Sequence, residues 1–231
     1  MKLVLGIFGS FVLVAITMNL CVSWHAQKRQ HPLNEVAQQT GGIHSFAEVI
    51  QATCGHEIRR LDPENKVHAK LAQLILTSGE IISLEMSQPF SPVRENHRIN
   101  EASKYFEDAL RERINEQQEF SCSIPKTLEG KEQRSGYPDL RIEHLASGEV
   151  FYLDPKLFEE TSKKSSFRTF YFEPSKTHKI TEDAVHLLVG FPHDGLARRW
   201  TFGKPVIVDL YDLKVKLKTE FSASNKDLYD Q

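Results

Sequence analysis

Two aspartates and one lysine stand at the two ends of a predicted β-hairpin. Asp139 follows Pro138 at the start of one β-rich run, and Asp154 and Lys156 follow the end of the next run. If the chain turns near Ser147, residues whose numbers sum to about 294 face each other, so Asp139 lies opposite the Asp154 end. Because side chains alternate along a strand, Asp154 and Lys156 project from the same face. The spacing predicts two carboxylates and one ammonium at one end of a sheet.

This set of side chains has the chemistry needed to hydrolyse phosphodiesters. A hard divalent cation such as Mg²⁺ or Mn²⁺ prefers a few carboxylate oxygens plus waters, and Asp139 and Asp154 are the predicted metal ligands. Lys156 is placed to orient or deprotonate the attacking water while the metal steadies negative charge on the phosphate. We therefore predict a metal-dependent nuclease with Asp139, Asp154 and Lys156 as its catalytic residues.

Acid-x-lysine triplets also occur at three other places, where the surrounding sequence does not predict a hairpin with a second acid: Glu64-Asn65-Lys66, Glu129-Gly130-Lys131 and Asp212-Leu213-Lys214. Pro155 argues against a central strand, because proline cannot donate to a sheet ladder, and it is tolerated where a strand ends or bulges. The alternative is an ordinary hairpin with charged residues on its surface.

The order Pro138-Asp139 followed by Asp154-Pro155-Lys156 resembles the PD-(D/E)xK nuclease superfamily, the restriction-endonuclease-like fold, over about residues 100–191. The resemblance implies a mixed central sheet flanked by helices, a metal held by Asp139 and Asp154, and Lys156 as the catalytic lysine. It also favours DNA over RNA as the substrate. Family members often add an acid from the helix before the hairpin, and Glu107 is the candidate, although other glutamates share that helix: Glu101, Glu112 and Glu116.

The elements around this motif read as helices first and a sheet afterwards. A capping-box pattern at 45–48 opens a short helix that Gly55 ends, Asp62-Pro63 begins a second helix, and a third covers about 100–118. After Pro125 the β-rich runs are 140–145, 149–153, 167–172, 185–191 and 206 to about 221, with a possible helical stretch at 180–184. We expect an α/β (α+β) domain over residues 44–231.

The amino terminus carries a different signal, because residues 3–22 contain no charge. A run of this length and apolarity indicates a signal peptide or a membrane anchor over 1–23, and the polar stretch at 24–43 indicates a linker. We therefore expect a secreted, periplasmic or membrane-anchored protein that contacts the membrane through residues 3–22 unless they are cleaved. Met18-Asn19-Leu20 before Cys21 does not fit an acylation site well.

The overall composition excludes several classes of protein. With 29 Lys+Arg against 31 Asp+Glu in 231 residues, the net charge is -2, so bulk charge alone would not hold nucleic acid. Three separated cysteines exclude a CxxC-type zinc module, and Cys54 and Cys122 are either a disulfide pair or two buried thiols. The ten histidines include no HxH or HxxxH pair, and no GxSxG, Walker or GxGxxG motif is present.

The carboxyl-terminal part of the chain carries more Lys and Arg than Asp and Glu. Its cations stand near aromatic residues, at 163–172 and 198–204, which suits contact with phosphates and stacked bases, although aromatic residues in β-rich runs more often form core. We predict an exported or membrane-anchored nuclease acting on DNA. The alternatives are a catalytically inactive nuclease-like module of the cell envelope that binds nucleic acid or a partner, and an envelope interaction protein with an accidental motif.

Overall fold

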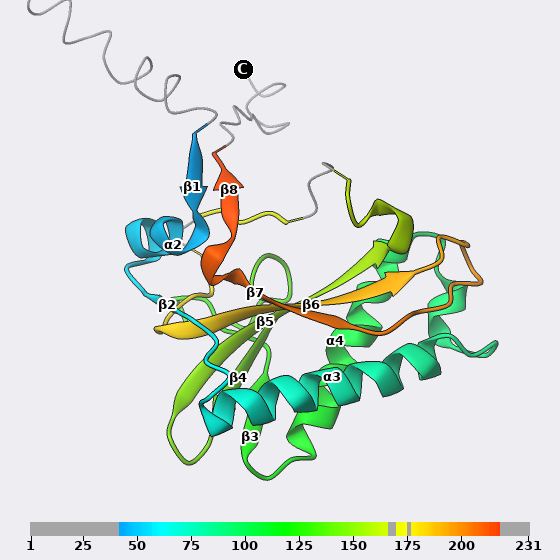
Figure 1. Cartoon of the computed structure of the whole chain (residues 1–231), viewed down its shortest axis with the longest axis horizontal. Coiled ribbons are helices and arrows are strands. Elements are labelled where there is room, and N and C mark those ends of the chain that lie inside the picture. Colours follow the sequence, from blue (N-terminus) through cyan, green and yellow to red (C-terminus); the bar gives the residue numbers. More distant parts are fainter. Residues whose placement is uncertain (1–41, 166–169, 175–176, 218–231) are drawn as a thin grey trace, which may run out of the picture. The chain divides into compact units, whose positions relative to one another are not determined.

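The computed structural model describes residues 42–165, 170–174 and 177–217 (Figure 1). The chain divides into two compact units, of which one comprises Ser45–Lys214. The strands β1 (Ile43–Ser45) and β8 (Lys214–Lys216) pair separately as a two-stranded sheet. The predicted targeting segment at 1–23 lies outside the described residues, and so does the linker up to residue 41.

A mixed six-stranded sheet forms the centre of the larger unit. The strand order is β2-β6-β5-β4-β3. The sixth strand, β7, is not part of this sequence of neighbours and pairs with β6, as β2 does. The pairs β2–β6 and β5–β6 are parallel, whereas the other three pairs are antiparallel. This arrangement confirms the predicted mixed central sheet, with bounds β2 (Ile58–Arg59), β3 (Phe120–Ser123), β4 (Leu140–His144), β5 (Glu149–Glu159), β6 (Ala184–His193) and β7 (Val206–Asp209).

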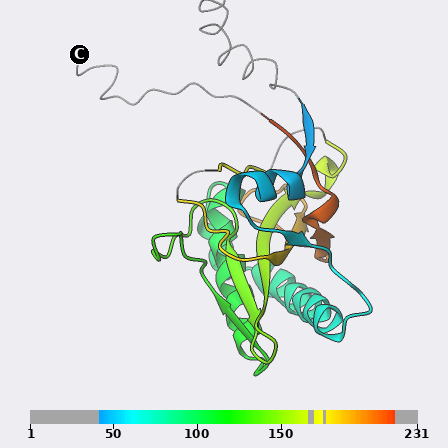
Figure 2. The same ribbon diagram turned by 90° about the vertical axis from the view of Figure 1, so that its left-hand side faces the viewer.

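Helices cover both faces of this sheet. The long helices α3 (Lys66–Met86) and α4 (Ile99–Asn115) pack on each other and on one face, where they bury a continuous apolar core that includes Leu71, Ile75, Phe106, Leu110, Ile142, Leu153, Leu187 and Phe191. The short helix α2 (Phe46–Cys54) lies at the other face (Figure 2). The ring of its first residue, Phe46, packs against the ring of His186. Alternation along β6 places His186 and the core residue Leu187 on opposite faces.

Helix boundaries follow local capping chemistry. The backbone N–H of Ser45 donates to Glu48 Oε2 at 3.0 Å, and Gly55 ends α2 in a left-handed conformation, as predicted. The start predicted for α3 at Asp62 is wrong, because Asn65 Oδ1 accepts from the N–H of Val67 and caps the helix.

The strand predictions differ from the structure in the second half of the chain. β5 continues six residues past 153, to Glu159, because β6 pairs with it in parallel as far as His193. The predicted strand at 206–221 is wrong as one element, since the Asp209 carboxylate caps a 3-10 turn (Leu210–Asp212) that ends β7. Residues 180–183 form no helix, and 170–172, the described part of the predicted 167–172 run, form no strand.

Two further expectations concern the whole chain. Cys54 and Cys122 are free thiols, so the disulfide alternative is not realised. In the described part of the chain, no helix combines the length and apolarity needed to cross a membrane.

Candidate active site

The β4–β5 hairpin determines where the first aspartate lies. Leu140 pairs with Leu153, so the numbers of facing residues sum to 293, one less than the predicted value. Asp139 immediately precedes β4, and continuing this register places it opposite Asp154. Pro155 lies beyond the end of the β4 pairing, in the part of β5 that only β6 pairs. No ladder bond to β4 is lost there, which explains why proline is tolerated in this strand.

The structure brings the three predicted site residues together. Lys156 Nζ lies 2.8 Å from Asp154 Oδ2 and 3.7 Å from Asp139 Oδ2. The Asp154 side chain is 1% exposed, Asp139 is 14% exposed and Lys156 is 34% exposed. The ammonium therefore bridges two carboxylates, and its partial exposure leaves it reachable from solvent.

Burial controls the electrostatics of this cluster. It raises the pKa of Asp154 from 3.8 to about 7, with a further rise from the negative charge of Asp139 and a smaller opposing effect of Lys156. Burial by itself would lower the pKa of Lys156, but the charges of the two aspartates outweigh it, so the pKa is raised. Lys156 is consequently an ammonium at neutral pH, whereas Asp154 changes charge in that range.

Glu107, the candidate third acid, extends from α4 toward the same cluster. Its side chain is 15% exposed, and its pKa is raised first by burial and then by the negative charge of Asp139. Arg134 partly balances it, with Nη1 at 3.9 Å from Glu107 Oε2 and Nη2 at 2.7 Å from Asp108 Oδ1. Glu107 is thus electrostatically coupled to Asp139 and Lys156.

A second lysine, Lys179, belongs to this region and is buried, and the sequence analysis missed it. Lys179 Nζ donates to the carbonyl oxygens of Gln133 at 3.0 Å and of Arg134 at 3.5 Å. Burial lowers its pKa, while Asp139 and Asp154 partly offset that effect. Lys179 lies between two strands and belongs to no sequence motif, so no signal in the sequence identified it.

A buried aromatic pair includes Tyr137, whose hydroxyl is within the electrostatic reach of Asp154 and Asp139. The hydroxyl of Tyr137 is hydrogen-bonded to Nδ1 of His186 at 2.7 Å, and the two rings are stacked. Burial lowers the pKa of His186 to about 3, so the imidazole is neutral. Burial also raises the pKa of Tyr137, and the charge of Asp154 adds to that rise. Both members of this pair are therefore uncharged at neutral pH.

The donor set suits a cation that is completed by water and substrate. Within the described residues, no group of three or more His, Cys, Asp or Glu side chains is arranged to hold a metal ion. Two converging carboxylates are present, and Mg²⁺ usually takes one or two carboxylates together with waters and phosphate oxygens. Asp154 Oδ2 is buried and, apart from the Lys156 ammonium at 2.8 Å, has no hydrogen-bond partner among the described residues, so it can accept a cation. Asp139 and Asp154 therefore fit Mg²⁺ or Mn²⁺.

The aromatic residues near the predicted basic segments are mainly structural. Trp200 is buried and Phe202 is nearly so, both as part of the core. Phe170 and Phe172 pack edge-on against the ring of Phe46. These contacts favour the structural alternative over base stacking for the four rings, with Trp200 and Phe202 in the core and Phe170 and Phe172 packed on Phe46.

Comparison with known proteins gives two matches. Residues 41–231 match the family described as "Type II restriction enzyme MjaV family". The chain is also similar to the type II restriction enzyme MjaV of Methanocaldococcus jannaschii, with 32% identity over 197 residues that cover 80% of this chain and 84% of the relative. No solved structure matches the chain.

Proposed function

Because the chain belongs to the MjaV type II restriction enzyme family, we propose that it is a metal-dependent endonuclease that hydrolyses phosphodiester bonds in DNA. Family membership supports a DNA nuclease. The observation that carries the proposal to a site is the convergence of Asp139, Asp154 and Lys156. Their order and spacing support a PD-(D/E)xK active site, with the first aspartate before one strand and the Asp-x-Lys on the next.

In this proposal Asp139 and Asp154 hold Mg²⁺ or Mn²⁺, and Glu107 adds negative charge from α4. The ion, when bound, supplies Lewis-acid stabilisation of charge on the phosphate. The buried position of Asp154 limits competition from solvent, and its raised pKa makes metal binding compete with a proton near neutral pH. A cation held by Asp139 and Asp154 would also reduce the repulsion between their two negative charges, which burial strengthens.

Lys156 supplies a fixed positive charge beside the attacked phosphate. Its ammonium is a hydrogen-bond donor, so it can hold the attacking water or a phosphate oxygen in position. The contacts with both aspartates fix the direction of the side chain while leaving it partly exposed to an approaching strand. Lys179 and Arg134 add positive charge around the carboxylates, which reduces repulsion of the DNA backbone.

The test is a plasmid-nicking assay with the purified full-length chain. We expect cleavage with Mg²⁺ or Mn²⁺ and none with EDTA, and Asp154→Asn should abolish cleavage without unfolding the protein. The matched control is Lys131→Ala, which removes the lysine of the Glu129-Gly130-Lys131 triplet from an exposed loop and should cut like the wild type.

Three outcomes contradict parts of the proposal. Cleavage in EDTA would reject the metal requirement, and an active Asp154→Asn variant would reject the site. Salt-sensitive DNA binding without cleavage in any divalent metal would favour the inactive binding module.

We also propose that residues 1–23 target the chain to a membrane or for export. The support is the charge-free run at 3–22, which lies before the family match at residue 41. Cell fractionation of the native host with mass spectrometry of the amino terminus tests this proposal. An uncleaved protein in the soluble cytoplasmic fraction would contradict both its versions.

A further inference from the structure

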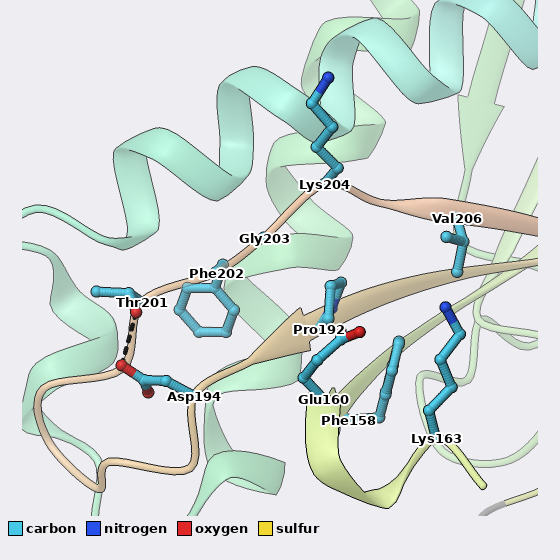
Figure 3. A pocket seen from close by; sticks show the side chains of 10 residues that line it. All are labelled: Phe158, Glu160, Lys163, Pro192, Asp194, Thr201, Phe202, Gly203, Lys204 and Val206. Atoms are coloured by element: carbon cyan, nitrogen blue, oxygen red, sulfur yellow. Dashed lines mark hydrogen bonds between the residues drawn. The ribbon is translucent and has the colours of Figure 1, made fainter.

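A pocket of about 460 Å³ lies at the carboxyl-terminal ends of β5 and β6 (Figure 3). Phe158, which lines it, follows Lys156 by two positions on β5, so both side chains project from the same face of the sheet. Pro192, the β6 partner of Phe158, lines the pocket as well. At about 3.3 Å per residue, the pocket begins roughly 7 Å along the strand from Lys156.

The pocket combines apolar walls with charges at its edge. Phe158, Pro192 and Val206 provide apolar surface, and Glu160 and Lys163 extend beside Phe158 from the turn that follows β5 (Figure 3). Within the described part of the chain, no carboxylate lies at ion-pair distance from Lys163. Its ammonium is therefore available to an anion.

A glycine makes room for the aromatic wall. Gly190 pairs with Lys156 in the β5–β6 register. A Cβ atom at this position would lie 2.9 Å from a ring carbon of Phe158 and 3.3 Å from Val206 Cγ2. The ring of Phe158 thus lies directly against the backbone of β6 at Gly190. This contact fixes the position of the ring beside Lys156, at the edge of the pocket.

We infer that this pocket binds one nucleotide of the DNA strand being cut, close to the scissile phosphate. The base packs against Phe158, and Lys163 contacts a phosphate of the same strand. This inference rests on the proposed nuclease function and adds the position of the substrate strand on the sheet.

The chemistry of the pocket selects a nucleotide in a definite orientation. Aromatic rings bind bases by stacking whatever their identity, and a lysine at the edge binds a backbone phosphate. The Glu160 carboxylate repels phosphate but accepts hydrogen bonds, as from the amino group of a cytosine or an adenine. The volume is also within the range of small-molecule sites, about 300–1,000 Å³.

Binding measurements test the role of Lys163. The duplex probe carries a cleavage site mapped from wild-type products, and divalent metal is omitted so that the probe stays intact. We expect Lys163→Ala to weaken binding about 5- to 20-fold and to reduce the slope of log affinity against log salt by about one.

The control is Lys66→Ala, another exposed lysine of the same unit. His68 Nε2 lies 2.8 Å from Glu149 Oε1, so the start of α3 is beside the first residue of β5, at the opposite end from the pocket. This variant should change affinity by less than about twofold. Equal affinities for Lys163→Ala and Lys66→Ala would overturn the phosphate contact.

A fluorescent base tests the role of Phe158. With 2-aminopurine at successive positions around the mapped site, the wild type should change the emission at one position, and Phe158→Leu or Gly190→Ala should reduce that change. The conservative Phe158→Leu keeps apolar volume in the fold, and Lys163→Ala alters an exposed residue, so misfolding cannot account for both results. Identical emission for the wild type and these variants at every position would overturn the inference.

The two proposals fail in different ways. If the wild type cuts no DNA with any divalent metal, the proposed function fails, and the inference fails with it. If the wild type cuts but the pocket variants match Lys66→Ala in affinity and emission, only the inference fails.

Discussion

The chain contains two Asp-x-Lys triplets near the ends of strands, and their surroundings differ completely. Asp154 of the first is 1% exposed and faces a second aspartate. Asp212 of the second is 69% exposed and receives both terminal nitrogens of Arg60, at 2.6 and 2.9 Å. Burial raises the pKa of Asp154, whereas the hydrogen bonds from Arg60 lower that of Asp212. The comparison indicates that burial and a second acid, not the triplet itself, raise the pKa of the first aspartate.

The largest expected effect is the difference in DNA cleavage rate between variants of the lysines in the two triplets. Lys156→Ala should lower the single-turnover rate of DNA cleavage by roughly 1,000-fold, because it removes a charge that stabilises the transition state. Lys214→Ala, in the other triplet, should leave the rate within about twofold of the wild type. Equal losses in the two variants would show that the triplets do not differ in function.

The second effect concerns stability and pH in metal-free protein. The pKa of Asp154 is raised in the folded state, so folding binds a proton between about pH 4 and 7, and stability falls as the pH rises through that window. Asp154→Asn should make stability independent of pH in this window, and its free energy of unfolding at pH 8 should exceed that of the wild type by an amount on the order of 3 kcal/mol. Urea unfolding in EDTA at pH 5 and pH 8 measures it, and a wild type equally stable at both values would contradict it.

The opposite sign is expected at the exposed triplet. Because the pKa of Asp212 is lowered in the folded state, its ionised carboxylate stabilises the fold at pH values above its ordinary pKa. This stabilisation is lost as the pH falls below about 4. Because solvent screens the pair with Arg60, Asp212→Asn should leave the melting temperature at pH 7 unchanged within error. A clear destabilisation would show that this surface pair matters more than its exposure indicates.

A fourth prediction separates metal binding at the first triplet from effects at the second. Mg²⁺ should raise the melting temperature of the wild type at pH 8 by a few degrees, because it binds only the folded site. The same titration should have little effect on Asp154→Asn and its full effect on Asp212→Asn. The shift should also shrink as the pH falls below 7, where a proton competes for Asp154. A shift that persists in Asp154→Asn would place the metal elsewhere.

A last prediction concerns the positive charge around the first triplet. Lys179→Met should destabilise the protein by about 1–3 kcal/mol, because the partly buried hydrogen bonds to the carbonyls of Gln133 and Arg134 are lost. Thermal unfolding at pH 7 measures this loss. A variant as stable as the wild type would show that water replaces the ammonium there.

The hairpin illustrates what was predictable. The turn and the strand period depend on neighbouring residues, so they indicated Asp139 opposite Asp154 with an error of one in the register. The α/β class was also predictable, because helices precede β-rich runs, whereas the mixed sheet followed only from the resemblance to the nuclease superfamily. The start of α3 was not, since Asp62 and Asn65 are both good caps and only the three-dimensional path of the chain selects Asn65.

By itself, the sequence determined the types and order of the site residues and the hairpin that carries them, because turn residues and alternation act over a few positions. Only the tertiary structure decided that β6 lies parallel to β5 and extends it to Glu159, that Lys179 approaches the carboxylates, and that Gly190 receives the ring of Phe158. These features join residues far apart in the chain, and their energies depend on burial, which no local pattern specifies.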